Sequence, residues 1–86
     1  MARKKKPSGR LSHGPFTFAD LEQAIMNDDW LEADHGDHPN YKHPTKSGKV
    51  QLDKKWTGVK KGSVVFKSVA RQAGLTQKQL LELLNA

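Results

Sequence analysis

The sequence predicts an α+β fold in which helices cover one face of a three-stranded antiparallel sheet. Three features lead to this prediction: a segment with helical apolar spacing near the N-terminus, a central stretch of alternating residues, and two capped apolar segments at the C-terminal end. A chain of 86 residues has room for one domain. We expect residues 15–86 to form this domain and the basic residues 1–14 to form a disordered arm.

The first helix is expected over residues 18–28. Thr17 is a suitable N-cap, and the carboxylate of Asp20 in the first turn would face the positive end of the helix dipole. Phe16 and Leu21 have the spacing of a hydrophobic staple. One side of the helix is apolar and should face the core; it consists of Phe18, Leu21, Ala24 and Ile25.

The strands should follow this helix. Residues 33–43 are expected to contain the first strand, and a turn at 44–48 connects it to a second strand at 49–55, where Val50 and Leu52 alternate with polar residues. Pro39 cannot donate a backbone hydrogen bond, so its strand should lie at a sheet edge or carry a bulge. Residues 56–59 are the candidate for the third strand.

Two helices should complete the domain. Ser63 can cap a helix whose apolar stripe includes Phe66 and Val69, and Gly74 is placed to end it. Thr76 and Gln79 have the spacing of a capping box at the start of a last, leucine-rich helix.

The charges divide the chain into regions. Residues 1–10 contain five Lys or Arg and no acid, residues 20–37 contain seven acids and no Lys or Arg, and residues 42–86 contain ten Lys or Arg against Asp53 and Glu82. The net charge of +6 favours a polyanionic partner, because neutralising phosphates releases counterions. A merely solvated lysine-rich surface is the alternative. The absence of cysteine and of a long apolar stretch predicts a cytoplasmic protein without a membrane span.

The segment DHGDHPNYKHP, residues 34–44, is dense in histidine and aspartate. A metal site would need His35 and His38 to converge, but a spacing of three places them on opposite faces of a strand, so we expect no metal and no other cofactor. A catalytic base is the second hypothesis. The third is that these residues form only a polar entrance to a strand.

The catalytic hypothesis depends on one row of a strand face. His38, Asn40 and Lys42 are spaced by two, which would align an imidazole, an amide and an ammonium. Gly36 on the same row would let a nucleic-acid backbone approach closely. RNA carries its own nucleophile in the 2′-hydroxyl, so cleavage needs only a base, an acid and cations near the phosphate. Tyr41 and His43 would lie on the other face and are expected to pack.

Five short motifs, in this order and spacing, resemble those of the HicA toxins, the mRNA interferases of type II toxin-antitoxin systems. The motifs are Gly36-Asp37-His38, Tyr41-Lys42-His43-Pro44, Gly48-Lys49-Val50, Gly62-Ser63-Val64 and Ala73-Gly74-Leu75-Thr76. The resemblance covers about residues 16–85. It implies a double-stranded-RNA-binding-domain-like fold of α-β-β-β-α topology, an endoribonuclease that cleaves mRNA without a cofactor, and a HicB-type antitoxin partner. The free protein would be a monomer, and the neutralised one a hetero-oligomer with the antitoxin.

The resemblance also implies residue roles. The catalytic histidine of the family corresponds to His38, while the serine before it is replaced by Asp37 in this chain. A second histidine that some members carry after the second strand is absent. The residues expected to bind RNA are Gly36, Asn40, Lys42, Lys54, Lys55, Lys60 and Lys61.

Two other classes of protein fit parts of the sequence. Residues 69–84 resemble a helix-turn-helix, with a small residue at Ala70 and a glycine at Gly74 in the turn, which would indicate DNA binding. The last helix contains only Lys78 as a cation, however, so its leucines are better explained by packing. The third class is a module that binds RNA or protein without catalysis.

Overall fold

The computed structural model describes residues 14–34 and 36–85 of the chain, so the predicted basic arm lies outside the described residues except for Gly14. The fold is α+β, as predicted. In chain order the elements are α2 (Phe18–Asn27), β1 (Leu31–Asp34), β2 (Asn40–Lys42), β3 (Val50–Gln51), α3 (Val64–Gln72) and α4 (Gln77–Leu84).

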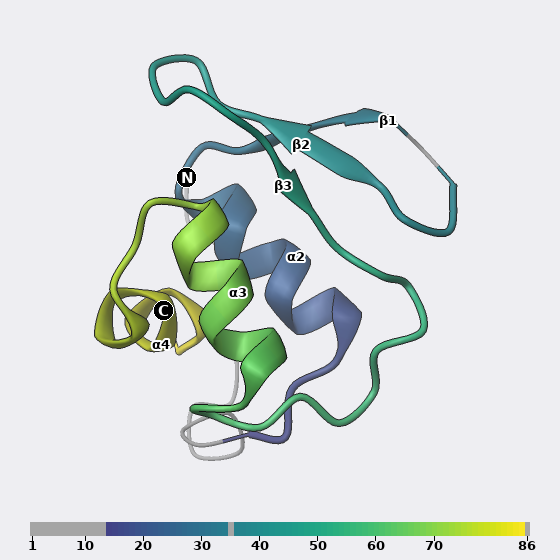
Figure 1. The fold of residues 1–86 in the computed structure, drawn as a ribbon, viewed down its shortest axis with the longest axis vertical. Helices are drawn as coiled ribbons and strands as arrows, with labels where there is room; N and C mark the ends of the chain where they lie inside the picture. Colours follow the sequence, from purple (N-terminus) through teal and green to yellow (C-terminus); the bar gives the residue numbers. More distant parts are fainter. Residues whose placement is uncertain (1–13, 35, 86) are drawn as a thin grey trace, which may run out of the picture.

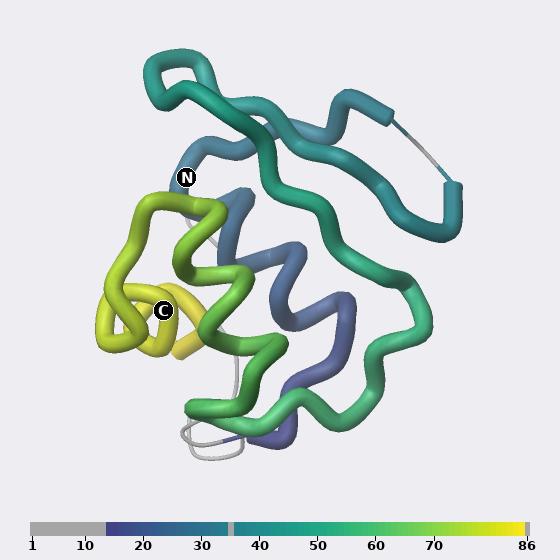
Figure 2. Tube along the Cα trace, viewed as in Figure 1, coloured from purple at the N-terminus to yellow at the C-terminus, as the bar shows by residue number. Residues whose placement is uncertain are grey.

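The three strands form one antiparallel sheet in the order β1-β2-β3. Figure 1 shows the sheet on one side of the molecule and helices α2, α3 and α4 gathered on the other. After β3 the chain runs around the side of α2 and returns below it to the start of α3 (Figure 2). One face of the sheet therefore packs on helices.

Helix α2 begins and ends close to the predicted bounds. The Thr17 hydroxyl accepts a hydrogen bond from the Asp20 amide, and the Asp20 carboxylate accepts one from the Thr17 amide, which completes a capping box. Both residues of the predicted staple, Phe16 and Leu21, are fully buried. The local sequence is sufficient to define this helix start.

Residues 33–43, expected to contain the first strand, contain the end of β1 and the whole of β2, because the chain reverses direction between these two strands. Gly36 lies in this reversal with a φ of 130°, a conformation that side-chain-bearing residues rarely adopt. Pro39 directly precedes β2, and its carbonyl accepts a hydrogen bond from the Leu52 amide. The sheet does contain a bulge, but it lies in β1, between Glu32 and Asp34.

The third strand is also not where the sequence placed it. Residues 56–59 contribute only an isolated antiparallel bridge, between Val59 and Phe16, and the third strand of the sheet is β1. β3 is short, and Gln72 of α3 covers part of its outer edge: the Gln72 side-chain oxygen accepts a hydrogen bond from the Gln51 amide at 2.9 Å.

The last two helices agree with the sequence. The hydroxyl of Ser63 caps α3, and Gly74 with a φ of 70° follows its C-cap residue, Ala73. Thr76 and Gln79 form the predicted capping box of α4. Within residues 14–34 and 36–85, the element order thus contains one helix more than the α-β-β-β-α pattern.

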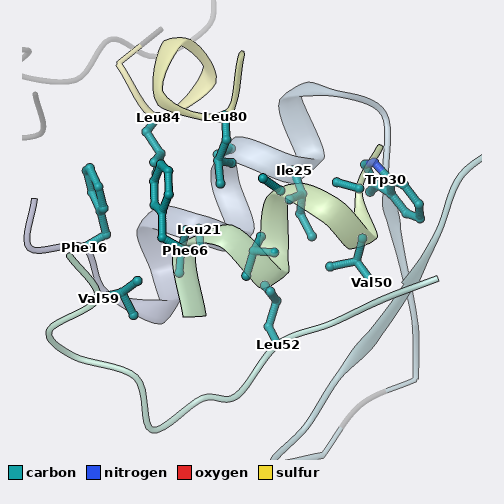
Figure 3. Close-up of a cluster of buried hydrophobic side chains, with 14 of the residues drawn as sticks. Phe16, Leu21, Ile25, Trp30, Val50, Leu52, Val59, Phe66, Leu80 and Leu84 are labelled. Atoms are coloured by element: carbon teal, nitrogen blue, oxygen red, sulfur yellow. The ribbon is translucent and has the colours of Figure 1, made fainter. Parts of the chain in front are cut away.

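The core lies between the sheet and the helices (Figure 3). The rings of Phe16 and Phe66 stack with centroids 6.0 Å apart, and Leu80 and Leu84 of α4 reach this cluster. Each large apolar side chain that is fully buried contributes roughly 1.5–3 kcal/mol relative to an exposed one. The core is therefore the main source of stability, as expected for a chain without cysteine.

A polar cluster joins the turn after β2 to the ends of α2 and α3. The Asp28 carboxylate accepts hydrogen bonds from Lys46 Nζ at 2.7 Å and from Trp30 Nε1 at 3.2 Å. Lys46 Nζ also donates to the carbonyl of Ala73 at the end of α3, 3.0 Å away. The ring of His43 donates to the Asp28 carbonyl and packs edge-on against Trp30. This cluster holds the hairpin at a fixed position on the helices.

In the part of the chain that the structure describes, none of the helices is both long and apolar enough to cross a bilayer.

Candidate functional site

The position of His38 follows from the pairing of β2 with β3. Asn40 pairs with Gln51 and Tyr41 with Val50. Backbone hydrogen bonds continue this register beyond the strands, from the Leu52 amide to the Pro39 carbonyl and from the Lys54 amide to the Asp37 carbonyl. His38 therefore lies directly across the ladder from Asp53.

Burial alternates along this segment. Pro39 and Tyr41 are fully buried against the helices, whereas His38 and Lys42 are exposed and Asn40 is half-buried. The predicted row of His38, Asn40 and Lys42 thus occurs on the outer face of the sheet, although His38 belongs to the extended lead-in to β2 and not to the strand itself.

His38 has an acidic neighbour that sequence reasoning missed. Its Nε2 lies 3.3 Å from Oδ2 of Asp53, with 59% of the His38 side chain and 25% of the Asp53 side chain exposed. The other carboxylate oxygen, Oδ1, accepts a hydrogen bond from the Lys55 amide at 2.8 Å. The register of the β2–β3 hairpin would have identified Asp53, because it places residues 38 and 53 opposite each other once the strand pairing is known.

Two of the predicted RNA-binding residues have structural roles. The Asn40 amide donates to the Asp34 carboxylate across β1 and β2, 3.2 Å away, and its oxygen is buried without a hydrogen-bond partner in the described structure. Gly36 allows the chain reversal, and no atom lies within 4 Å of where a Cβ would be. The surface beside Gly36 is therefore sterically open.

The predicted lysines separate into two groups, all of them exposed. Lys42 lies on the outer strand row, and Lys54 and Lys55 follow β3 next to the His38–Asp53 pair. Lys60 and Lys61 lie in the turn before α3, beyond the Val59 bridge, on the side of the molecule away from the sheet (Figure 1). Only the first group lies on the two paired segments that carry His38 and Asp53.

Both acidic and basic side chains lie near His38 in the chain or on the paired segment. Asp53 contacts the ring, and the exposed Asp37 precedes it in the chain, while Lys54 and Lys55 follow on the paired segment. Negative charge at this position opposes the approach of a phosphate to His38 unless the lysines offset it.

Tyr41 and His43 pack, as predicted. Tyr41 is fully buried and its hydroxyl donates to a Glu22 carboxylate oxygen at 2.6 Å. Burial, together with this hydrogen bond and the negative charge of Glu22, raises the pKa of Tyr41 well above its ordinary value. His43 Nδ1 accepts hydrogen bonds from the backbone amides of Thr45 and Lys46, so both of its ring nitrogens have fixed partners.

Two cavities lie away from His38. One of about 450 Å³ lies between the turn after β2 and the end of α3, beside Lys46 and Arg71, and one of about 270 Å³ lies between Asp28 and α4. His38 is instead on an open surface, which suits an extended chain better than a small molecule. Over residues 14–34 and 36–85, no three His, Cys, Asp or Glu side chains are grouped as ligands for a metal ion.

The arrangement offers an exposed imidazole, a carboxylate at its side and cations from two neighbouring segments. Such a set can transfer a proton and hold a phosphate. Comparisons with protein-family models, curated proteins and solved structures find no match to this chain.

Proposed function

We propose that this chain is a metal-independent endoribonuclease of the HicA type, a toxin that cleaves mRNA and is neutralised by a HicB-type antitoxin. The observation that carries the proposal is the exposed His38 on the outer sheet face, with the exposed Lys42 on its own segment and the exposed Lys54 and Lys55 next to Asp53 on the paired one. The proposed assignment to the HicA type rests on the resemblance of the five sequence motifs.

In the proposed reaction neutral His38 removes the proton of a ribose 2′-hydroxyl. The 2′-oxygen attacks the adjacent phosphorus, the bond from phosphorus to the 5′-oxygen breaks, and a 2′,3′-cyclic phosphate forms as the 5′-oxygen takes up a proton. Lys42 and Lys54 stabilise the negative charge that grows on the phosphorane oxygens. No redox step or external nucleophile is needed.

The exposure of His38 explains the proposed substrate and partner. A single-stranded or locally unpaired RNA can lie along an open sheet face and present its 2′-hydroxyl, whereas a rigid duplex holds its backbone in one shape. An open site of this kind also needs a second protein to cover it when the activity is not wanted, which is the role proposed for the antitoxin.

The test is cleavage of a long mRNA by the purified protein in EDTA. Wild type should cut, and His38→Ala should lose at least 100-fold in rate because a general base typically contributes 10²–10⁴-fold. His35→Ala, which removes the histidine three positions earlier in the sequence, serves as the control. Asp37→Ser should increase the rate, because it restores the serine of the family motif and removes a negative charge. Equal cleavage by wild type and His38→Ala would refute the proposal.

The lysines allow a second, independent test by RNA binding. Lys42→Ala and Lys54→Ala should each reduce the slope of log Kobs against log salt concentration by about 0.7, the value for one phosphate contact on a single strand. Lys60→Ala removes the same charge on the other side of the molecule and should change this slope less. An equal effect of all three would favour diffuse electrostatic attraction over a defined site.

The helix-turn-helix alternative has less support in the packing. α4 buries Leu80 and Leu84 in the core and presents mainly Gln77, Lys78, Gln79 and Glu82 to solvent. A DNA-reading helix would present more basic side chains to the phosphates and bases. Preferential binding of duplex DNA over single-stranded RNA would reverse this order.

A further inference from the structure

We propose that Asp53 is a positioning residue that sets the tautomer of His38, so that the proton stays on Nε2 and Nδ1 acts as the base. This inference rests on the proposed function for its catalytic consequence, but the tautomer itself can be measured without any activity. Asp53 was not among the residues expected from the sequence motifs.

The backbone fixes where Asp53 lies. The hydrogen bonds that continue the β2–β3 ladder on either side, at Leu52 and Lys54, place it opposite His38. The Lys55 amide binds Oδ1 at 2.8 Å, and this short turn orients the carboxylate so that Oδ2 lies toward the imidazole. Each oxygen of Asp53 thus has its own partner.

The contact between Asp53 and His38 determines which ring nitrogen of His38 carries the proton. A carboxylate only accepts hydrogen bonds, so the Nε2 beside it at 3.3 Å is favoured as the protonated nitrogen. This distance is longer than the 2.7–2.9 Å of typical charge-assisted hydrogen bonds, so the proposal requires the exposed His38 ring to turn toward Oδ2. Nδ1 has no hydrogen-bond partner among the described residues and is left to take the 2′-hydroxyl proton.

Asp53 also acts after the proton has moved. Once Nδ1 has accepted it, the ring is an imidazolium, and the adjacent carboxylate stabilises that positive charge while remaining ionised itself. This is the part that the aspartate plays in serine protease triads. Asp53 repels the phosphate of the substrate, but its stabilisation of the His38 imidazolium offsets this cost.

His43 provides an internal reference. Its Nδ1 accepts backbone amide hydrogen bonds and its Nε2 contacts the Asp28 carbonyl, which fixes the Nε2-protonated tautomer independently of Asp53. Every correctly folded variant should retain this signature of His43.

The experiment is long-range ¹H–¹⁵N NMR of the imidazole rings at a pH where His38 is neutral, in wild type, Asp53→Asn and the control Asp34→Asn. Wild type and the control should show His38 protonated on Nε2. In Asp53→Asn the amide oxygen can keep the Lys55 hydrogen bond while its NH₂ faces Nε2, so His38 should change to the Nδ1-protonated form. An unchanged tautomer in Asp53→Asn, or an Nδ1-protonated His38 in wild type, would overturn the proposal.

Kinetics separate this proposal from the proposed function. Asp53→Asn should lower kcat by roughly tenfold or more, a part of the 10²–10⁴-fold that a general base supplies, with little change in KM. Asp34→Asn should stay within a factor of two or three. A tautomer change without loss of kcat would overturn the catalytic role. If wild type itself does not cleave RNA, the proposed ribonuclease function is refuted, and the NMR experiment alone tests whether Asp53 sets the tautomer of His38.

A second variant covers the case in which Asp53→Asn does not fold, recognised by loss of the His43 signature. Asp53→Ser keeps a hydroxyl that can accept from the Lys55 amide but is too short to reach the ring. His38 should then populate both tautomers, and retention of a single Nε2-protonated form would overturn the proposal.

Discussion

Tyr41 is the only tyrosine in the chain, so its ionisation can be followed by phenolate absorbance near 295 nm. It is fully buried and hydrogen-bonded to Glu22, and burial is the largest of the causes that raise its pKa. An ordinary tyrosine ionises near pH 10. We expect native protein to show no phenolate step there, and denatured protein to show one.

The sign of the effect on stability follows from proton binding. Between about pH 10 and the raised pKa of the folded state, the unfolded chain has lost the Tyr41 proton and the native chain has kept it. The contribution of Tyr41 is therefore fully present below about pH 10 and falls by about 1.4 kcal/mol for each pH unit above that value. Lysines titrate in the same range, so the measured quantity is the difference between wild type and Tyr41→Phe.

The Tyr41→Phe variant also gives a magnitude at neutral pH. It removes one hydrogen bond to a half-buried carboxylate that water can partly solvate, which should cost roughly 1–2 kcal/mol. For a domain of this size that lowers the Tm by about 4–16 °C. Urea unfolding of wild type and Tyr41→Phe, followed by circular dichroism at pH 7 to 11, measures both the loss of stability at neutral pH and the change of this difference with pH.

Two results would refute this reasoning. One is a reversible phenolate step near pH 10 while the circular dichroism of the fold is unchanged. The other is a difference between wild type and Tyr41→Phe that stays constant from pH 8 to 11.

Three further predictions concern the rest of the fold. Lys46→Met removes an ion pair and a hydrogen bond at the end of α3 and should lower the free energy of unfolding by about 1–3 kcal/mol, whereas the exposed Lys49→Met should change it by less than about 0.5 kcal/mol in the same urea titration. Ile25→Ala should lower the free energy of unfolding by about 2–5 kcal/mol through the cavity it leaves, and Met26→Ala, on the exposed side of α2, should lower it much less. Equal losses for the two variants in thermal unfolding would contradict the assigned core face. Gly74→Ala should cost about 1 kcal/mol, because its φ of 70° strains a residue with a Cβ, and an unchanged Tm would argue against that backbone conformation.

The helices could be predicted from sequence because their signals are local. Thr17 with Asp20, Ser63, and Thr76 with Gln79 each bind backbone groups only three residues away, so their spacing along the chain decides the outcome. Burial of one face then follows from the apolar period. None of these features depends on how distant parts of the chain meet.

The sheet was less predictable because pairing is not local. Gly36 could equally be a strand residue or a reversal, and only the pairing of β1 with β2 decides between the two. Asp53 was missed for the same reason, since its proximity to His38 depends on the register of a hairpin with a long turn. The row of His38 and Lys42 was predictable because alternation alone defines it.

The hydrogen bond from the Gln51 amide to Gln72 has a consequence for association between molecules. A strand edge exposes backbone groups that can pair with a second chain, and proteins commonly block such edges. Here a helix side chain occupies a donor on the β3 edge, while the bulge between Glu32 and Asp34 distorts the β1 edge on the other side. Both borders of a small sheet are thus poor templates for intermolecular strand addition, and the open outer face that carries His38 can stay exposed without promoting β-aggregation.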